Sequence, residues 1–194
     1  MARLPLWLLL GLLVTANADV AEQGPLDFEL LSSQGPVTVE TFRGQVVYLY
    51  FGYTHCPDVC PTSLATLAAA FNQLTPSQLA RVQGLFVTVD PERDDLERLD
   101  AYVHWFHPRI RALTGTAEQI AQAAARFGVE YQKEPLPDSA MGYAMNHTAA
   151  IYVITPEGEL GYVFPHGTPA EVLAEAARHL LEKAHGPGAE KAGP

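Results

Sequence analysis

The sequence predicts an α/β domain in which helices flank a central mixed β-sheet, with a β-hairpin at its start. Two apolar runs, 46–51 and 84–89, have the length and the β-branched and aromatic content of buried strands. Helical spacing of apolar residues follows each run, and two more strand-like runs and an amphipathic segment come last. The 194 residues, 48% hydrophobic and 18% charged, are enough for one domain with a core.

The first half of the domain is expected to begin with the hairpin, because strand-like residues flank the turn residues 33–36. After a turn at 40–44, the buried strand 46–51 leads through a short loop into a helix. This helix is expected to begin near Pro61, a residue suited to a first helical turn. The next elements are a short helix near 75–77, a strand at 84–89 and a helix at about 95–107, which Pro108 ends.

The second half begins with an edge-like segment at 111–115 and a helix from 116 to about 127. Thr116 and Gln119 fit a capping box at the start of this helix, and Gly128 ends it. The remaining expected elements are a strand at 129–132, a loop at 134–145, a hairpin of 149–154 with 160–164, and a final helix at 168–183.

Residues 1–18 have the layout of a secretory signal peptide, with Arg3, an apolar stretch, and the small residues Ala16 and Ala18 before a cleavage site. The apolar run 4–14 is shorter than the roughly 20 residues that span a bilayer. An uncleaved N-terminal membrane anchor is the alternative. The pattern predicts export to the periplasm or the outer face of the cytoplasmic membrane, with the domain at 19–184 and a flexible tail at 185–194.

The charge balance is acidic, with 12 Lys and Arg against 22 Asp and Glu and a formal net charge of -10. No basic stripe interrupts this acidity, so nucleic acid is not expected as a partner. Solubility explains the charge. Attraction to a basic partner or to cations is the alternative.

The two cysteines of the chain, Cys56 and Cys60, lie between the first buried strand and the helix that follows it. The partial positive charge of a helix N-terminus favours thiolate over thiol and lowers the pKa of a cysteine there. Thiolate is the form that attacks disulfides and binds metals. A purely structural disulfide is disfavoured, since a domain of this size does not need one and a bridge over three residues stabilises little.

Three segments resemble the Sco/SenC family: 51–61 with its Cys-Pro-Asp-Val-Cys-Pro motif, 89–94, and His147 leading into 151–158. The resemblance covers roughly 24–181. It implies a thioredoxin-like fold and a copper-binding protein that assists assembly of the dinuclear copper site in cytochrome c oxidase subunit II. It also implies that Cys56, Cys60 and His147 are copper ligands, for Cu(I) and also for Cu(II).

The chemistry of these residues suits that role. Two thiolates are soft ligands that favour Cu(I), and one imidazole completes a three-coordinate site with an open side for a partner's ligand. A structural zinc site needs four ligands, and His55 is the candidate for the fourth, so zinc is the weaker alternative. The cysteine spacing also permits a disulfide, through which oxidation would prevent metal binding.

Other residues near the motifs have weaker assignments. Asp90 is expected to lie beside the ligands, where its carboxylate would hydrogen-bond one of them, although a turn or cap before Pro91 explains it equally well. His55, next to Cys56 in the sequence, is a second candidate for a residue that lies beside the copper ligands without binding the metal. Tyr53 would form a wall of the site or simply part of the core, and Asp58 is expected to be exposed. His147 is distinguished from the other histidines by the resemblance alone.

We therefore expect a copper metallochaperone rather than an enzyme. The alternative is a thiol:disulfide oxidoreductase that keeps the cysteines of oxidase subunit II reduced, with Cys56 as the attacking and Cys60 as the resolving thiol. A peroxide-reducing cysteine is the third candidate, but no positioned arginine is evident near the motif. The expected partners are subunit II, a copper donor and a thiol reductant, and the chain is expected to be a monomer.

Overall fold

The computed structural model describes residues 26–184, so the predicted leader 1–18 and tail 185–194 lie outside the described residues. Its centre is a five-stranded sheet in the order β5-β4-β3-β8-β9. The pairs β3/β4 and β4/β5 are parallel, and β3/β8 and β8/β9 are antiparallel, which confirms the expected mixed sheet. The strands are β3 (Val46–Gly52), β4 (Val82–Thr88), β5 (Ile110–Leu113), β8 (Ala150–Ile154) and β9 (Leu160–Pro165).

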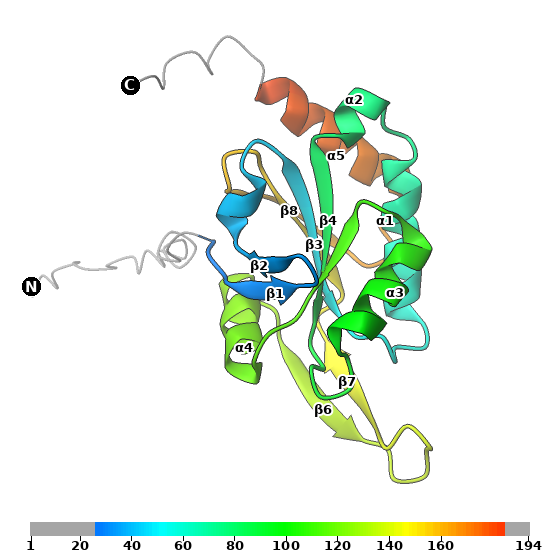
Figure 1. The fold of residues 1–194 in the computed structure, drawn as a ribbon. Coiled ribbons are helices and arrows are strands. Elements are labelled where there is room, and N and C mark those ends of the chain that lie inside the picture. Colours follow the sequence, from blue (N-terminus) through cyan, green and yellow to red (C-terminus); the bar gives the residue numbers. More distant parts are fainter. Residues whose placement is uncertain (1–25, 185–194) are drawn as a thin grey trace, which may run out of the picture.

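Helices cover both faces of this sheet. The helices α1, α3 and α5 pack beside one another, with α1 in contact with both of the others, and α2 touches α5. Figure 1 shows α4 and the hairpin β1–β2 on the opposite side of the sheet from α1 and α3. The helices are α1 (Val59–Phe71), α2 (Pro76–Leu79), α3 (Leu96–Phe106), α4 (Ala117–Arg126) and α5 (Ala170–Lys183). In the described part of the chain, none of them has the length and apolarity needed to cross a membrane.

The burial of the neighbouring strands β3 and β4 explains why the sequence predicts them as apolar runs. Every residue of β3 and of β4 is buried. A strand with both faces covered by helices reads as a continuous apolar run, without polar alternation. The cysteine loop follows β3 directly, so the start of α1 is anchored to the most buried part of the sheet.

Local signals set several of the other boundaries. The N-terminal hairpin is confirmed as β1 (Leu30–Ser32) paired with β2 (Gly35–Val37). The capping box of α4 is also confirmed, with Thr116 and Gln119 bonding to each other's backbone N–H groups. The expected turn at 40–44 contains a short 3-10 helix, η1 (Val39–Phe42), because the N–H groups after Thr38 bond three residues back.

The loop expected at 134–145 is confirmed only for 136–142, and both of its ends are wrong. Instead, β6 (Tyr131–Pro135) and β7 (Tyr143–His147) pair antiparallel as a separate two-stranded sheet. Figure 1 shows this hairpin projecting beyond the end of the central sheet. The strand β6 is mostly exposed and β7 is mostly half-buried, so neither has the apolar run that marks a core strand, and the nearby prolines favour a loop.

Candidate metal centre

Two thiols and one imidazole meet at the end of β3. One ligand atom from each of Cys56, Cys60 and His147 lies within 4.8 Å of the others, and among residues 26–184 no other such group of His, Cys, Asp or Glu occurs. Cys56 comes from the loop after β3, Cys60 from the first turn of α1, and His147 from the end of β7. The structure thus brings together the three residues that the resemblance singled out, from three different elements.

The start of α1 places the two sulfur atoms. Its first helical residue is Val59 rather than Pro61, so Cys60 is already helical while Cys56 still lies in the loop. The Cys60 N–H donates to Cys56 Sγ at 3.4 Å, and both thiols are free and buried. A sulfur that accepts an N–H bond at a helix N-terminus is favoured as thiolate.

The two thiols differ in acidity. The hydrogen bond from the Cys60 thiol, together with backbone N–H groups, lowers the pKa of Cys56 to about 3 against the opposing effect of burial. The pKa of Cys60 is raised, first by that same hydrogen bond to Cys56 and then by burial. The metal-free pair therefore holds one proton near neutral pH, with Cys56 as thiolate and Cys60 as thiol.

We expect one thiolate per chain in the reduced, metal-free protein at pH 6, where an ordinary cysteine with a pKa of about 8.5 is almost fully protonated. The ultraviolet thiolate absorbance should persist as the pH falls and disappear only near the lowered pKa of Cys56. Cys56→Ser should remove the signal. Cys60→Ala should keep it but shift its loss to higher pH, because no side-chain donor then faces the Cys56 thiolate. A signal that appears only above pH 8 would contradict this assignment.

The imidazole of His147 is oriented for a ligand. Its Nδ1 donates to the Thr148 carbonyl at 3.2 Å, which leaves the lone pair on Nε2, and this atom lies 3.4 Å from Cys60 Sγ. The rings of Tyr50 and Tyr53 both meet the imidazole edge-on, at centroid distances of 6.1 and 6.0 Å. Tyr53 thus forms a wall of the site and is also part of the core.

Gly52 makes room for the buried sulfur. A Cβ at this position would lie 3.0 Å from Cys60 Sγ and 2.8 Å from the ring of Phe86. Contacts this short force neighbouring atoms to move. The absence of a side chain at the end of β3 therefore lets Cys60 pack directly against the strand.

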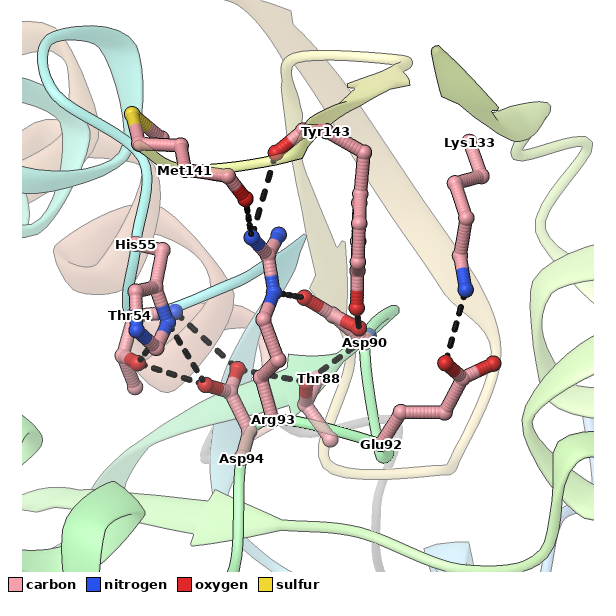
Figure 2. A network of polar contacts seen from close by, with 10 residues as sticks. All are labelled: Thr54, His55, Thr88, Asp90, Glu92, Arg93, Asp94, Lys133, Met141 and Tyr143. Carbon is pink, nitrogen blue, oxygen red and sulfur yellow. Dashed lines mark hydrogen bonds and ion pairs between the residues drawn. The ribbon is translucent and has the colours of Figure 1, made fainter. Parts of the chain in front are cut away.

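Asp94 holds the backbone just before Cys56. Its fully buried carboxylate accepts hydrogen bonds from the Thr54 N–H at 3.0 Å, from the Thr54 hydroxyl and from the Thr88 hydroxyl at 2.8 Å (Figure 2). His55 Nδ1 lies 3.7 Å from the same carboxylate and thus faces Asp94. The sequence alone does not indicate this role of Asp94, because Asp94 and Thr54 are 40 positions apart.

Asp90 contacts groups other than the sulfurs. Its carboxylate accepts hydrogen bonds from Arg93 Nε and, at 2.8 Å, from the Tyr143 hydroxyl. Arg93 was also missed from the sequence, although it lies in the same motif. Its guanidinium is held by Asp90 and by two backbone carbonyls.

The fourth ligand that a structural zinc site needs is not supplied by His55, which faces Thr54 and Asp94. Asp58 is exposed, as expected, and makes no side-chain cap to α1. Among the described residues, two thiols and one imidazole remain as candidate ligands, a donor set that suits Cu(I).

Comparison with known proteins places these features in context. The sequence profile of the SCO1/SenC family matches residues 17–182. The chain is 43% identical over 163 residues to the protein SCO2 homolog, mitochondrial, of Bos taurus, and 39% identical over 153 residues to the SCO1 homolog 1, mitochondrial, of Arabidopsis thaliana. These matches cover 83% and 74% of this chain but only 61% and 45% of the relatives.

Solved structures match over most of both chains. Arabidopsis thaliana ScoI with copper bound has a TM-score of 0.74 at 33% identity, over 81% of this chain and 97% of its own. Bradyrhizobium japonicum ScoI with copper bound has a TM-score of 0.72 at 33% identity, over 80% and 98%. Apo Sco1 from Thermus thermophilus has a TM-score of 0.71 at 42% identity, over 80% and 91%. These likenesses confirm the expected thioredoxin-like fold.

Proposed function

Because this chain belongs to the SCO1/SenC family, we propose that it is a copper metallochaperone that binds Cu(I), and also Cu(II), through Cys56, Cys60 and His147. In this proposal it assists assembly of the dinuclear copper site of cytochrome c oxidase subunit II. The observation that carries the proposal is the convergence of two thiols and one oriented imidazole within 4.8 Å. The copper bound to two similar solved proteins supports the choice of metal.

The protonation state of the pair fits reversible copper binding. Cys56 is already a thiolate, so only Cys60 has to release a proton when both sulfurs bind the metal. Binding therefore releases protons, and affinity is expected to rise with pH. Three ligands from one chain leave one side of Cu(I) open, where a ligand of the acceptor can bind before the donor's ligands leave.

The proposal extends to place and partners. The pattern in 1–18 predicts an exported chain with its domain at 19–184, whereas the curated relatives are named as mitochondrial proteins. We therefore keep periplasmic export as a prediction, which fractionation of expressing cells and mass measurement of the product test. A copper donor, a thiol reductant and a monomeric state complete the proposal.

An anaerobic titration tests metal binding. The reduced chain is titrated with Cu(I) against a competing chelator, and we expect one tightly bound Cu(I) per chain. The disulfide form of the same protein is the matched control, because oxidation removes both thiolates without changing the sequence. No binding by the reduced chain, or equal binding by both forms, would contradict the proposal.

A second function, thiol:disulfide exchange, is favoured by the lowered pKa of Cys56 beside a buried thiol. The Cys56 thiolate attacks a disulfide of the oxidase subunit, forming a mixed disulfide and releasing one substrate thiolate. Cys60, after losing its proton, attacks the Cys56 sulfur, which releases the second thiolate and leaves a Cys56–Cys60 disulfide that an external dithiol must reduce. Cys60→Ser should trap the mixed disulfide, and His147→Ala should spare this reaction while weakening copper binding.

A further inference from the structure

The hairpin β6–β7 carries His147 but shares no strand pairing with the central sheet. The described backbone bonds between its strands and across its base, such as Thr148 N–H to the Glu130 carbonyl, lie within this segment of the chain. The two residues between His147 and β8 join the hairpin to the central sheet at one end. The rest of the hairpin is held against the domain by side-chain contacts. Figure 2 shows where such contacts gather, at the loop that follows β4.

Arg93 lies at the centre of these contacts. Its Nη1 donates to the carbonyl oxygens of Met141 at 3.3 Å and Tyr143 at 3.1 Å, and its Nε donates to Asp90. The guanidinium carbon also lies 3.6 Å from the centroid of the Tyr143 ring. The Arg93 side chain is only 17% exposed, so these interactions are little screened by water.

Asp90 and Tyr143 close the same cluster. The Tyr143 hydroxyl donates to one oxygen of Asp90 while Arg93 occupies the other, and the Asp90 N–H is itself fixed by the Thr88 hydroxyl at 3.0 Å. Burial and the hydrogen bond to Asp90 raise the pKa of Tyr143 to about 12, so its hydroxyl keeps its proton at neutral pH. The first residue of β7 is thereby attached to the loop that follows β4 by its ring, its hydroxyl and its carbonyl.

We propose that Arg93, together with Asp90 and Tyr143, is a clamp that positions His147 for copper, an inference that rests on the function proposed above. Tyr143 and His147 are the two ends of one short strand. Because the four peptide units between them are extended, a fixed position of Tyr143 restricts the position of His147. Arg93 is a positioning residue that contacts no ligand atom. Its effect on copper is transmitted entirely through His147.

A double-mutant cycle on Cu(I) affinity tests this transmission. Arg93→Gln should weaken binding by about 10-fold to 100-fold, the usual loss when a residue that orients a ligand is removed. In a His147→Ala background the same change should have less than about a twofold effect, because the imidazole it positions is gone. Arg93→Lys should rescue little, since an ammonium lacks the planar fork that reaches a carboxylate and two carbonyls.

Arg43→Gln is the matched control, because Arg43 also pairs with an acidic residue three positions earlier, Glu40, but on an exposed surface. It should leave Cu(I) affinity unchanged. Unchanged affinity in Arg93→Gln would overturn the clamp. The clamp would also be overturned if Arg93→Gln lowered Cu(I) affinity as much in the His147→Ala background as in the wild-type protein. Arg93 would then act on the cysteines.

Hydrogen exchange of the metal-free chain gives a readout without copper. Arg93→Gln should accelerate exchange of the β6 and β7 amides by about tenfold or more while leaving those of α4 unchanged. Equal acceleration in both places would mean general destabilisation and would overturn the clamp. If wild-type protein binds no Cu(I), the metallochaperone proposal fails, while this measurement still decides whether Arg93 holds the hairpin.

Discussion

Cys60→Ser is expected to weaken Cu(I) binding by on the order of a thousandfold, about 4 kcal/mol. A hydroxyl is a hard ligand that keeps its proton at neutral pH, whereas the thiolate it replaces is soft. Cys60 is fully buried beneath Gly52, so water cannot readily take the place of the lost ligand. Competition against a chelator under anaerobic conditions measures the change.

His147→Ala should cost less than Cys60→Ser, because two thiolates alone still form a linear site that Cu(I) accepts. Ala65→Ser is a suitable control, since it adds a hydroxyl to an exposed position of the same helix. Retention of wild-type affinity by Cys60→Ser would show that copper binds elsewhere. A larger loss from His147→Ala than from Cys60→Ser would mean that the imidazole is the principal ligand.

Asp94→Ala is expected to lower the free energy of unfolding by about 3–5 kcal/mol. The change leaves three donors, the Thr54 N–H and the hydroxyls of Thr54 and Thr88, without the acceptor they share. Each unsatisfied buried group costs about 1–3 kcal/mol, although some can turn towards water. Urea unfolding of the reduced, metal-free chain measures the loss.

Two further variants test whether the loss of stability comes from the buried hydrogen bonds of Asp94 or from the removal of any carboxylate in this region. Asp94→Asn keeps an acceptor oxygen and should cost less than alanine. Asp95→Ala removes the neighbouring carboxylate, which caps α3 by accepting the Arg98 N–H, and should cost only about 1 kcal/mol. Equal losses for Asp94→Ala and Asp95→Ala would contradict the role assigned to the buried network.

The sequence predicted the parts of the fold that depend on local pattern and burial. The strands β3 and β4 are mostly apolar because both their faces are covered, and the start of α4 has a self-contained capping signal. The sequence does not indicate β7, because this strand pairs with the exposed strand β6 and not with a strand of the central sheet. No apolar periodicity arises in that situation.

The same reasoning applies to the site. The cysteine pair stands out from its position between a buried strand and a helix, whereas a lone histidine such as His147 has no local signature, and only the family resemblance indicated it. Asp94 and Arg93 act through partners about 40 to 50 residues away, so their roles require the folded geometry. The sequence predicts that Asp90 hydrogen-bonds a copper ligand. Its carboxylate instead accepts a hydrogen bond from the Tyr143 hydroxyl of the hairpin.

If His147 is a copper ligand as proposed, the separate hairpin is expected to affect the rates of copper binding and release. The sulfurs belong to the core, so the imidazole reaches them at an effective concentration that the docking of the hairpin determines. Brief undocking would lower that concentration without unfolding the central sheet, because local opening requires less free energy than global unfolding. Copper would then be held by two sulfurs alone for the lifetime of the undocked state, which makes the rate of metal release adjustable independently of the stability of the fold.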